Sequence, residues 1–299
     1  MNDVTAVAAE RVAQEVRDSG GTALAYAASV TDEAAIETMV GTVLDAWGNI
    51  DILVNNAGIL RDKSFAKMTI ADFRTVVDVH LMGAAICSKA VWEPMRQRGF
   101  GRIVMTTSSS GLYGNFGQAN YGAAKMALVG LMQTLAIEGE KYGIRVNCLA
   151  PTAATGMTEG VLDAESLKML APERVSPALL SLLGDDAPTR AILCAGAGHF
   201  AVANITLTRG TYVGAAEDAG EQFIERWNKI ADRTDEAVPA YGLYRQNARL
   251  KRRKRSDEQT SDIEELIMPL ERPELGRFCQ SRIGRQGVFR PSHSTSSPT

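Results

Sequence analysis

The chain has 299 residues, of which 45% are hydrophobic and 22% are charged. This composition supports a sizeable core and excludes a chain that is disordered throughout, while the length allows one large α/β domain with appendages or two small domains. A net charge of -3 argues against a general nucleic-acid binder. The lack of a run of about 18 apolar residues argues against a transmembrane helix.

The cysteines, the histidines and the N-terminus bear on compartment and metal binding. The four cysteines are widely spaced and form no Cys-x-x-Cys pair, which is typical of reduced thiols in a reducing compartment. Residues 1–4 form neither a basic leader nor an apolar signal core, so secretion is not expected and we predict a cytoplasmic protein. The three histidines have no metal-ligand spacing, so no metal site is predicted.

The first quarter of the chain alternates helical and extended patterns. Apolar residues at helical spacing predict a helix over 5–18, which Gly20 and Gly21 would end, and a short strand follows over 22–30. Thr31 is the predicted N-cap of a second helix that runs to Trp47.

The middle of the chain continues this alternation. A continuous apolar strand is predicted over 51–58 and a long helix over 69–98. The remaining elements predicted are a strand at 102–105, a helix from Tyr121 to about 142, a strand at 145–150 halted by Pro151, helices within 161–185 and a last strand at 191–195. Apolar strands separated by helices predict an α/β fold with a doubly wound parallel sheet covered on both faces.

The pattern changes after Gly214, and we predict three regions from it. Residues 1–215 form the α/β domain, and 216–243 form a helical extension around an amphipathic helix at 217–233. Residues 244–299 have the composition of a disordered tail. The basic run at 251–255 is interpreted as a solvated part of that tail, with a nuclear-import or anionic-partner signal as the alternative.

The segment 107–125 carries the clearest chemistry. Ser108 ends a buried strand, and Tyr121 and Lys125 lie four residues apart on the following helix, which places them on one face. A lysine beside a tyrosine favours the phenolate, so we expect Lys125 to lower the pKa of Tyr121 and make it a general acid or base.

The arrangement Ser-x12-Tyr-x3-Lys resembles that of the short-chain dehydrogenase/reductase family. The sequence from Gly111 to Tyr121, Gly-Leu-Tyr-Gly-Asn-Phe-Gly-Gln-Ala-Asn-Tyr, is similar to the corresponding segment of the (3R)-hydroxyacyl-CoA dehydrogenase unit of peroxisomal multifunctional enzyme type 2 and its bacterial stand-alone relatives. The resemblance covers about 1–230. It implies a Rossmann-like fold, NAD with NADP as the alternative, and a small-molecule alcohol substrate of the 3-hydroxyacyl-CoA type.

The resemblance also implies residue roles. Tyr121 would transfer the proton, Ser108 would bind the substrate oxygen, and Lys125 would hold the nicotinamide ribose. His80 stands where the family usually has an asparagine that assists a proton relay; a relay role and an ordinary buried histidine are both open. The other cofactor-binding residues implied lie at strand ends: Ser29, Val30, Asn55, Asn56, Ala57, Gly58, Pro151, Thr152, Ala153 and Thr155. Ser29 replaces the family's usual aspartate, so weaker contact with adenine is expected.

The helix that begins near Tyr121 is apolar on several faces and must bury more than one of them. The resemblance implies that this helix pairs across a two-fold axis in a homodimer, with burial inside one chain as the alternative. No membrane or nucleic-acid partner is predicted.

One part of the family pattern is missing. A Thr-Gly-x-x-x-Gly-x-Gly turn between the first strand and helix, which would cradle the pyrophosphate, does not occur before Asn55. The first strand-helix unit is therefore expected to be absent, either because the start codon is assigned too late or because the chain is a truncated, inactive paralogue acting through dimerisation.

Overall fold

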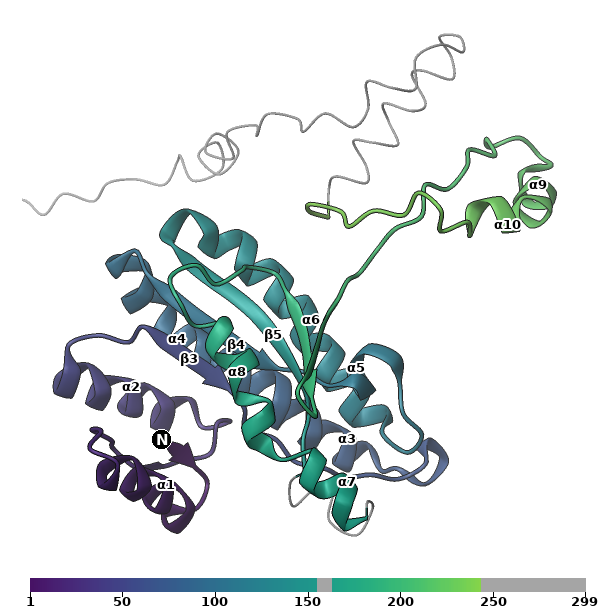
Figure 1. Ribbon diagram of the computed structural model, residues 1–299. Helices are drawn as coiled ribbons and strands as arrows, with labels where there is room; N and C mark the ends of the chain where they lie inside the picture. Colours follow the sequence, from purple (N-terminus) through teal and green to yellow (C-terminus); the bar gives the residue numbers. More distant parts are fainter. Residues whose placement is uncertain (155–162, 243–299) are drawn as a thin grey trace, which may run out of the picture. The chain divides into compact units, whose positions relative to one another are not determined.

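Five strands form the central sheet of the computed structural model, which describes residues 1–154 and 163–242 (Figure 1). Their order along the sheet is the order of the chain, β3-β4-β5-β6-β7. The first three pairings are parallel and the last is antiparallel. The strands are β3 (Ile52–Asn55), β4 (Gly101–Thr106), β5 (Ile144–Thr152), β6 (Ile192–Gly196) and β7 (His199–Ala203).

A second, two-stranded parallel sheet precedes it. β1 (Asn2–Asp3) pairs with β2 (Tyr26–Ala27), and α1 (Ala6–Asp18) connects them. The strand predicted over 22–30 is thus reduced to two residues. Among the described strands β3 pairs only with β4, so the single doubly wound sheet expected from the alternation is divided into two sheets.

The helices agree with the predicted spans, with three differences. The single amphipathic helix predicted at 217–233 is two short helices, α9 (Ala219–Glu225) and α10 (Trp227–Ile230). α2 (Glu33–Trp47) is capped by Asp32, whose carboxylate accepts from the Ala35 amide at 3.0 Å, so the prediction of Thr31 as the cap was wrong. The predicted helix 69–98 consists of α3 (Ile70–Val77), a π-helical turn (Asp78–Met82) and α4 (Gly83–Arg98). The other helices are α5 (Ser109–Tyr113), α6 (Ala119–Gly139), α7 (Ala164–Met169) and α8 (Ser176–Ser181).

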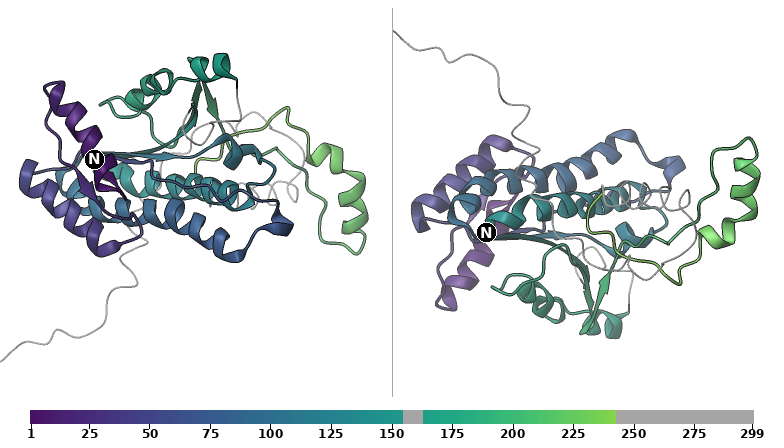
Figure 2. Two further views of the ribbon diagram at one scale, coloured as in Figure 1. Left: turned by 90° about the horizontal axis from the view of Figure 1, so that it is seen from below. Right: turned by 90° about the horizontal axis from the view of Figure 1, so that it is seen from above.

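Helices cover both faces of the central sheet (Figures 1 and 2). On one face, alternate residues of β4, Ile103 and Met105, pack with side chains of α4 and α6 such as Met95 and Met132. On the other face Val104 packs with Leu182, next to α8. β4 is therefore buried along its whole length, as expected for a central parallel strand.

β3 is covered on one face only. Leu53 packs against the core, whereas Ile52 and Val54 on the opposite face are 44% and 36% exposed. Parallel strands are usually buried on both faces, and β3 has the continuous apolar sequence of such a strand. The exposure of Ile52 and Val54 therefore departs from the full burial that this sequence pattern favours.

The end of β5 and the hairpin after β6 differ from the sequence predictions. Pro151 lies inside β5, paired with Ala195, and does not halt it. The pairing of β5 with β4 ends at Leu149, so only β6 flanks the proline at its level. The unpredicted strand β7 returns beside β6 through Ala197 and Gly198, which both have positive φ, 51° and 77°.

The predicted domain limits at 215 and 243 remain predictions. Met1–Val238 form one compact unit. The predicted tail 244–299, with the basic run 251–255, lies outside the described residues. None of the helices that the structure describes combines the length and hydrophobicity needed to cross a bilayer.

Gly143 and Gly130 offer a matched test of the backbone. Gly143 has φ +68° and a Cβ there would lie 2.3 Å from the Gly99 carbonyl oxygen, whereas nothing lies within 4 Å of a Cβ at Gly130 in α6. We expect Gly143→Ala to lower the free energy of unfolding by at least about 2 kcal/mol. Gly130→Ala should raise it by about 0.5–1 kcal/mol. Urea denaturation measures both, and equal effects would contradict the turn geometry.

Candidate active site

The carboxyl ends of β3 and β4 lie side by side and are joined by side chains. The Asn55 amide donates to the Ser88 hydroxyl at 3.1 Å, which ties β3 to α4. The Thr106 hydroxyl donates to the Asn56 side-chain oxygen at 3.0 Å, which ties β4 to the segment after β3. Ligands of open α/β sheets bind at this end of the strands.

Ser108, Tyr121 and Lys125 meet at this edge. Ser108 follows β4 and caps α5, where its hydroxyl accepts from the Ser110 amide at 3.2 Å. α6 presents the other two residues, and the Lys125 ammonium lies 5.5 Å from the centroid of the Tyr121 ring. The structure therefore brings together the three residues that the spacing predicted.

Two threonines that the sequence reasoning missed hold α6 against β4. The Lys125 ammonium donates to the Thr106 carbonyl at 2.6 Å, and the Thr107 hydroxyl donates to the Lys125 carbonyl at 2.7 Å. Asn120, also missed, is fully buried and donates to the Arg61 carbonyl at 3.1 Å. The only sequence signal for these residues is their position beside Ser108 and Tyr121.

The pKa of Tyr121 does not shift in the predicted direction. Burial of the phenol raises its pKa above the usual 10, and the side-chain hydrogen bond with Ser108 opposes that rise only in part. The expected lowering by Lys125 is wrong for this arrangement, because the ammonium is bonded to the Thr106 carbonyl and lies over the ring.

Lys125 is a buried lysine whose ammonium loses its proton more readily than that of an exposed lysine. Its side chain is 3% exposed, and burial lowers its pKa to about 8. An ammonium has three N–H donors, and the bond to the Thr106 carbonyl accounts for one of them. The ammonium can therefore donate to a further acceptor oxygen.

His80 lies in the π-helical turn and is 3% exposed. Its Nε2 lies 3.1 Å from the Ile59 amide nitrogen and 2.9 Å from the Ile59 carbonyl oxygen. Its ring meets Tyr121 edge to face, with 5.2 Å between centroids. The histidine therefore belongs to the same cluster as Tyr121.

The remaining predicted residues lie around this cluster or apart from it. The Ser29 and Thr31 hydroxyls are 2.8 Å apart within their own loop, and Val30 packs against Gly83 at the start of α4. Asn56 and Ala57 are exposed, while Gly58 packs under His80. Pro151 and Thr152 end β5 and Ala153 follows them, whereas Thr155 lies outside the described residues.

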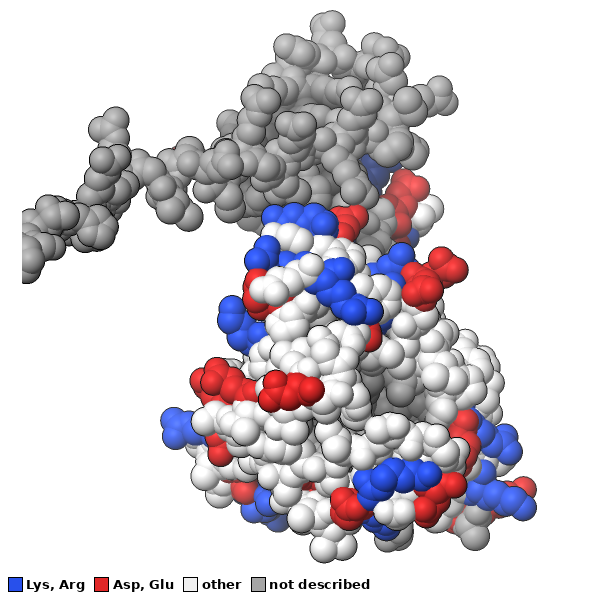
Figure 3. Space-filling view, turned by 90° about the vertical axis from the view of Figure 1, so that its left-hand side faces the viewer, with Lys and Arg blue, Asp and Glu red and all other residues white. Residues whose placement is uncertain are grey.

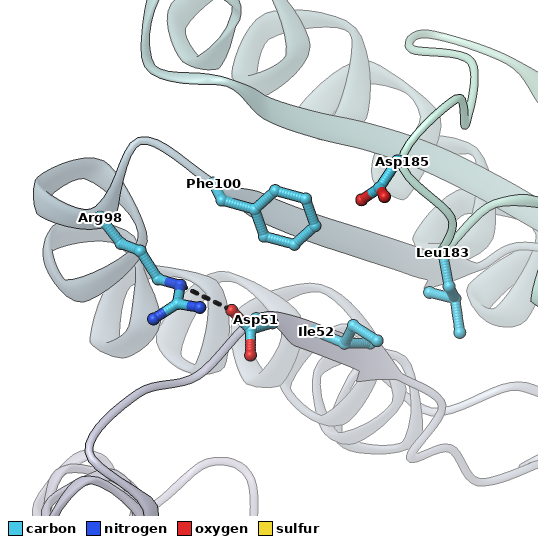
Figure 4. Close-up of a pocket in the computed structure, with 6 residues that line it drawn as sticks. All are labelled: Asp51, Ile52, Arg98, Phe100, Leu183 and Asp185. Carbon is cyan, nitrogen blue, oxygen red and sulfur yellow. Dashed lines mark ion pairs between the residues drawn. The ribbon is translucent and has the colours of Figure 1, made fainter.

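A cavity lies away from this cluster. It has a volume of about 600 Å³ and lies at the opposite ends of β3 and β4, where Arg98 and Asp51 form an ion pair of 2.9 Å beside Ile52 and Phe100 (Figure 4). Acidic and basic side chains are interspersed over the face shown in Figure 3. No group of three metal-ligating side chains occurs within 1–154 and 163–242.

The residues present fit one half of a nicotinamide dinucleotide. Exposed Asn56 and Ala57 leave the backbone after β3 accessible, and the Lys125 ammonium has donors for a ribose hydroxyl. In the described part of the chain before β3, no strand passes through a glycine-rich turn into a helix N-terminus. The fit therefore extends to the nicotinamide and its ribose and not to the pyrophosphate.

Comparisons with known proteins agree with this geometry. The peroxisomal multifunctional enzyme A of Dictyostelium discoideum is 44% identical over 233 residues, which cover 78% of this chain and 52% of that protein. The chain thus spans about half the length of this relative.

Two solved structures are also similar. The full-length peroxisomal multifunctional enzyme type 2 of Drosophila melanogaster has a TM-score of 0.71 and 32% identity, covering 83% of this chain and 44% of that one. A 7α-hydroxysteroid dehydrogenase complexed with NADH and 7-oxo glycochenodeoxycholic acid has a TM-score of 0.61 and 30% identity, covering 66% and 82%. The family described as short chain dehydrogenase matches residues 1–166. Because this match covers more than half of the chain, the protein belongs to the short-chain dehydrogenase family.

Proposed function

We propose that the protein interconverts a secondary alcohol and a ketone with a nicotinamide cofactor, using Tyr121 as the general acid and base. The observation that supports this most directly is the meeting of Ser108, Tyr121 and Lys125 at the carboxyl edge of the sheet. Family membership supports the same reaction class.

The chain's own residues would handle the proton and the orientation of the substrate. In oxidation, ionised Tyr121 accepts the proton of the substrate hydroxyl; in reduction, its phenol donates that proton to the carbonyl oxygen. Ser108 donates a hydrogen bond to the same oxygen, and Lys125 donates to the nicotinamide ribose. When bound, the cofactor supplies C4 as the hydride acceptor or donor.

The proposed substrate is a 3-hydroxyacyl-CoA thioester and the proposed cofactor is NAD, with NADP as the alternative. The substrate proposal is supported by the sequence of the segment from Gly111 to Tyr121 and by the similarity of the chain to multifunctional enzymes. The cofactor proposal is supported by the NADH in a similar solved structure. Asn55–Gly58, with Ser29, Val30 and the Pro151–Thr155 segment, are the proposed cofactor contacts.

Assembly and location also remain proposals. We propose a homodimer, supported by Met126 and Ile137 of α6, which are both 39% exposed although much of this apolar helix is buried within the chain. The two multifunctional enzymes named above are called peroxisomal, which does not support the cytoplasmic location expected from the sequence, so the location stays a prediction.

Cofactor titration tests the proposed function. We expect NADH to raise the Tm and quench the fluorescence of Trp47, Trp92 and Trp227, and a (3R)-hydroxyacyl-CoA to reduce NAD at 340 nm in a standard absorbance assay. No response at millimolar cofactor would favour the alternative, a non-catalytic paralogue that acts through dimerisation. Sedimentation of the same samples measures the dimer independently of turnover.

A further inference from the structure

The turn that carries His80 interrupts an otherwise continuous helical segment. Residues Asp78–Met82 form a π-helical turn between α3 and α4, with His80 buried at its centre. A π-helical turn widens the helix locally and is frequent at functional sites. Here it coincides with the one imidazole that contacts Tyr121 in the described part of the chain.

The imidazole is bonded to the backbone that follows the cofactor segment. Nε2 faces both the amide and the carbonyl of Ile59, at 3.1 and 2.9 Å. A neutral imidazole nitrogen either accepts or donates, so one of these two bonds forms in each tautomer. In both tautomers His80 therefore fixes Ile59.

The same ring touches Gly58 on one side and Tyr121 on the other. A Cβ at Gly58 would lie 2.3 Å from Cε1 of His80, so the ring packs directly on the glycine backbone. Its contact with Tyr121 is T-shaped, with 88° between the planes. The imidazole thus lies between the end of the cofactor segment and the proton-transferring phenol.

We propose that His80 is a positioning residue that sets the spacing between the Gly58–Ile59 backbone and the Tyr121 ring. This inference rests on the proposed function, because it concerns the alignment of the nicotinamide segment with the phenol. It differs from a proton relay, in which the imidazole would gain and lose a proton during turnover. Burial, with the nearby Lys125 charge, lowers the pKa of His80 to about 4, which agrees with an imidazole that stays neutral.

Glutamine and leucine at position 80 separate the alternatives. The terminal amide of glutamine reaches about as far as Nε2 and can bond Ile59, whereas leucine fills space without bonding. We expect His80→Gln to keep kcat within about threefold of wild type and His80→Leu to lose roughly tenfold, the scale of one hydrogen bond. Equal loss in both variants would indicate a proton relay, and retention in both would indicate simple packing; either result overturns the proposal.

Hydrogen exchange of the Ile59 amide gives a second readout that needs no cofactor or turnover. Exchange should be roughly tenfold faster in His80→Leu than in His80→Gln, again the scale of one hydrogen bond. Equal exchange rates together with equal thermal melting of the two variants would overturn the proposal even if the wild-type protein proved inactive, because a bond from Nε2 to the Ile59 carbonyl is reported by stability and not by exchange of the Ile59 amide. An inactive wild type with the expected exchange difference would instead refute the proposed function alone.

The contact with Gly58 supplies a suppressor test. Gly58→Ala should lower kcat by roughly tenfold or more, because the new methyl displaces the ring or the backbone. In a Gly58→Ala, His80→Ala double variant the methyl has room, so kcat should be no lower than in His80→Ala alone. A further loss in the double variant would show that Gly58 and His80 act separately.

Discussion

Replacing Tyr121 by phenylalanine will lower kcat by roughly 10²- to 10⁴-fold, the usual contribution of a positioned general acid or base. The change removes only the phenol oxygen, so the ring contact with His80 and the packing of α6 persist. Tyr113→Phe is the matched control, because it makes the same change nearby on a side chain that is 74% exposed. NADH-linked turnover and thermal melting of both variants provide the measurement.

Thermal melting and the response to NADH are measured separately from turnover, so a loss of chemistry in Tyr121→Phe can be told apart from a loss of folding or of cofactor binding. The Tyr121→Phe protein should melt close to wild type and still respond to NADH. Substantial turnover in that variant would refute the proton-transfer role. Since burial raises the pKa of Tyr121, wild-type oxidation should also become faster as the pH rises through the alkaline range, where the phenolate forms.

Replacing Lys125 by methionine will abolish a pH dependence of stability. The pKa of Lys125 is about 8 in the folded chain and about 10.5 when exposed, so between these values the unfolded chain binds more protons. The contribution of Lys125 to wild-type stability therefore rises from pH 8 to 10.5 as the buried charge is lost, by about 3 kcal/mol at 1.36 kcal/mol for each pH unit, and it appears as the difference between wild type and variant. Below pH 8 the full cost of the buried cation is present.

Urea denaturation of wild type and Lys125→Met between pH 7.5 and 10.5 measures this difference. The variant should lack this contribution, although losing the bond to Thr106 subtracts a constant amount at every pH. Lys89→Met, an exposed lysine on α4, is the control and should follow wild type. Burial raises the pKa of the Cys148 thiol to about 12 in the folded chain, which lowers stability at alkaline pH because the unfolded thiol ionises first; this effect is present in wild type and variant alike and cancels in their difference. Parallel curves for wild type and Lys125→Met would contradict a buried ammonium of lowered pKa.

The sequence predicted most of the elements and the shared face of Tyr121 and Lys125, because both depend on local spacing. Tyr121 and Lys125 are one helical turn apart in any α-helix, so their shared face needs no tertiary information. The helical spacing of apolar residues likewise predicted the ends of α1, α2 and α6 to within a few residues.

Features that depend on long-range packing were not predictable in this way. The direction of the Tyr121 pKa shift depends on burial and on the Thr106 carbonyl, which lies 19 residues from the ammonium it binds. The π-helical turn at His80 has no composition signal of its own. Pro151 could be expected to end a strand, and only the pairing shows that β5 continues along β6 beyond the end of β4.

The exposed edge of β3 has a consequence for how the protein behaves in solution. Its outer row of backbone amides and carbonyls, with Ile52 and Val54 beside it, forms a template for pairing with another chain, and strand edges of this kind promote aggregation. We therefore expect the protein to self-associate through β3 as its concentration rises. The same strand continues into Asn55 and Asn56, so a molecule that pairs along this edge would also restrain the segment for which we propose contact with the cofactor.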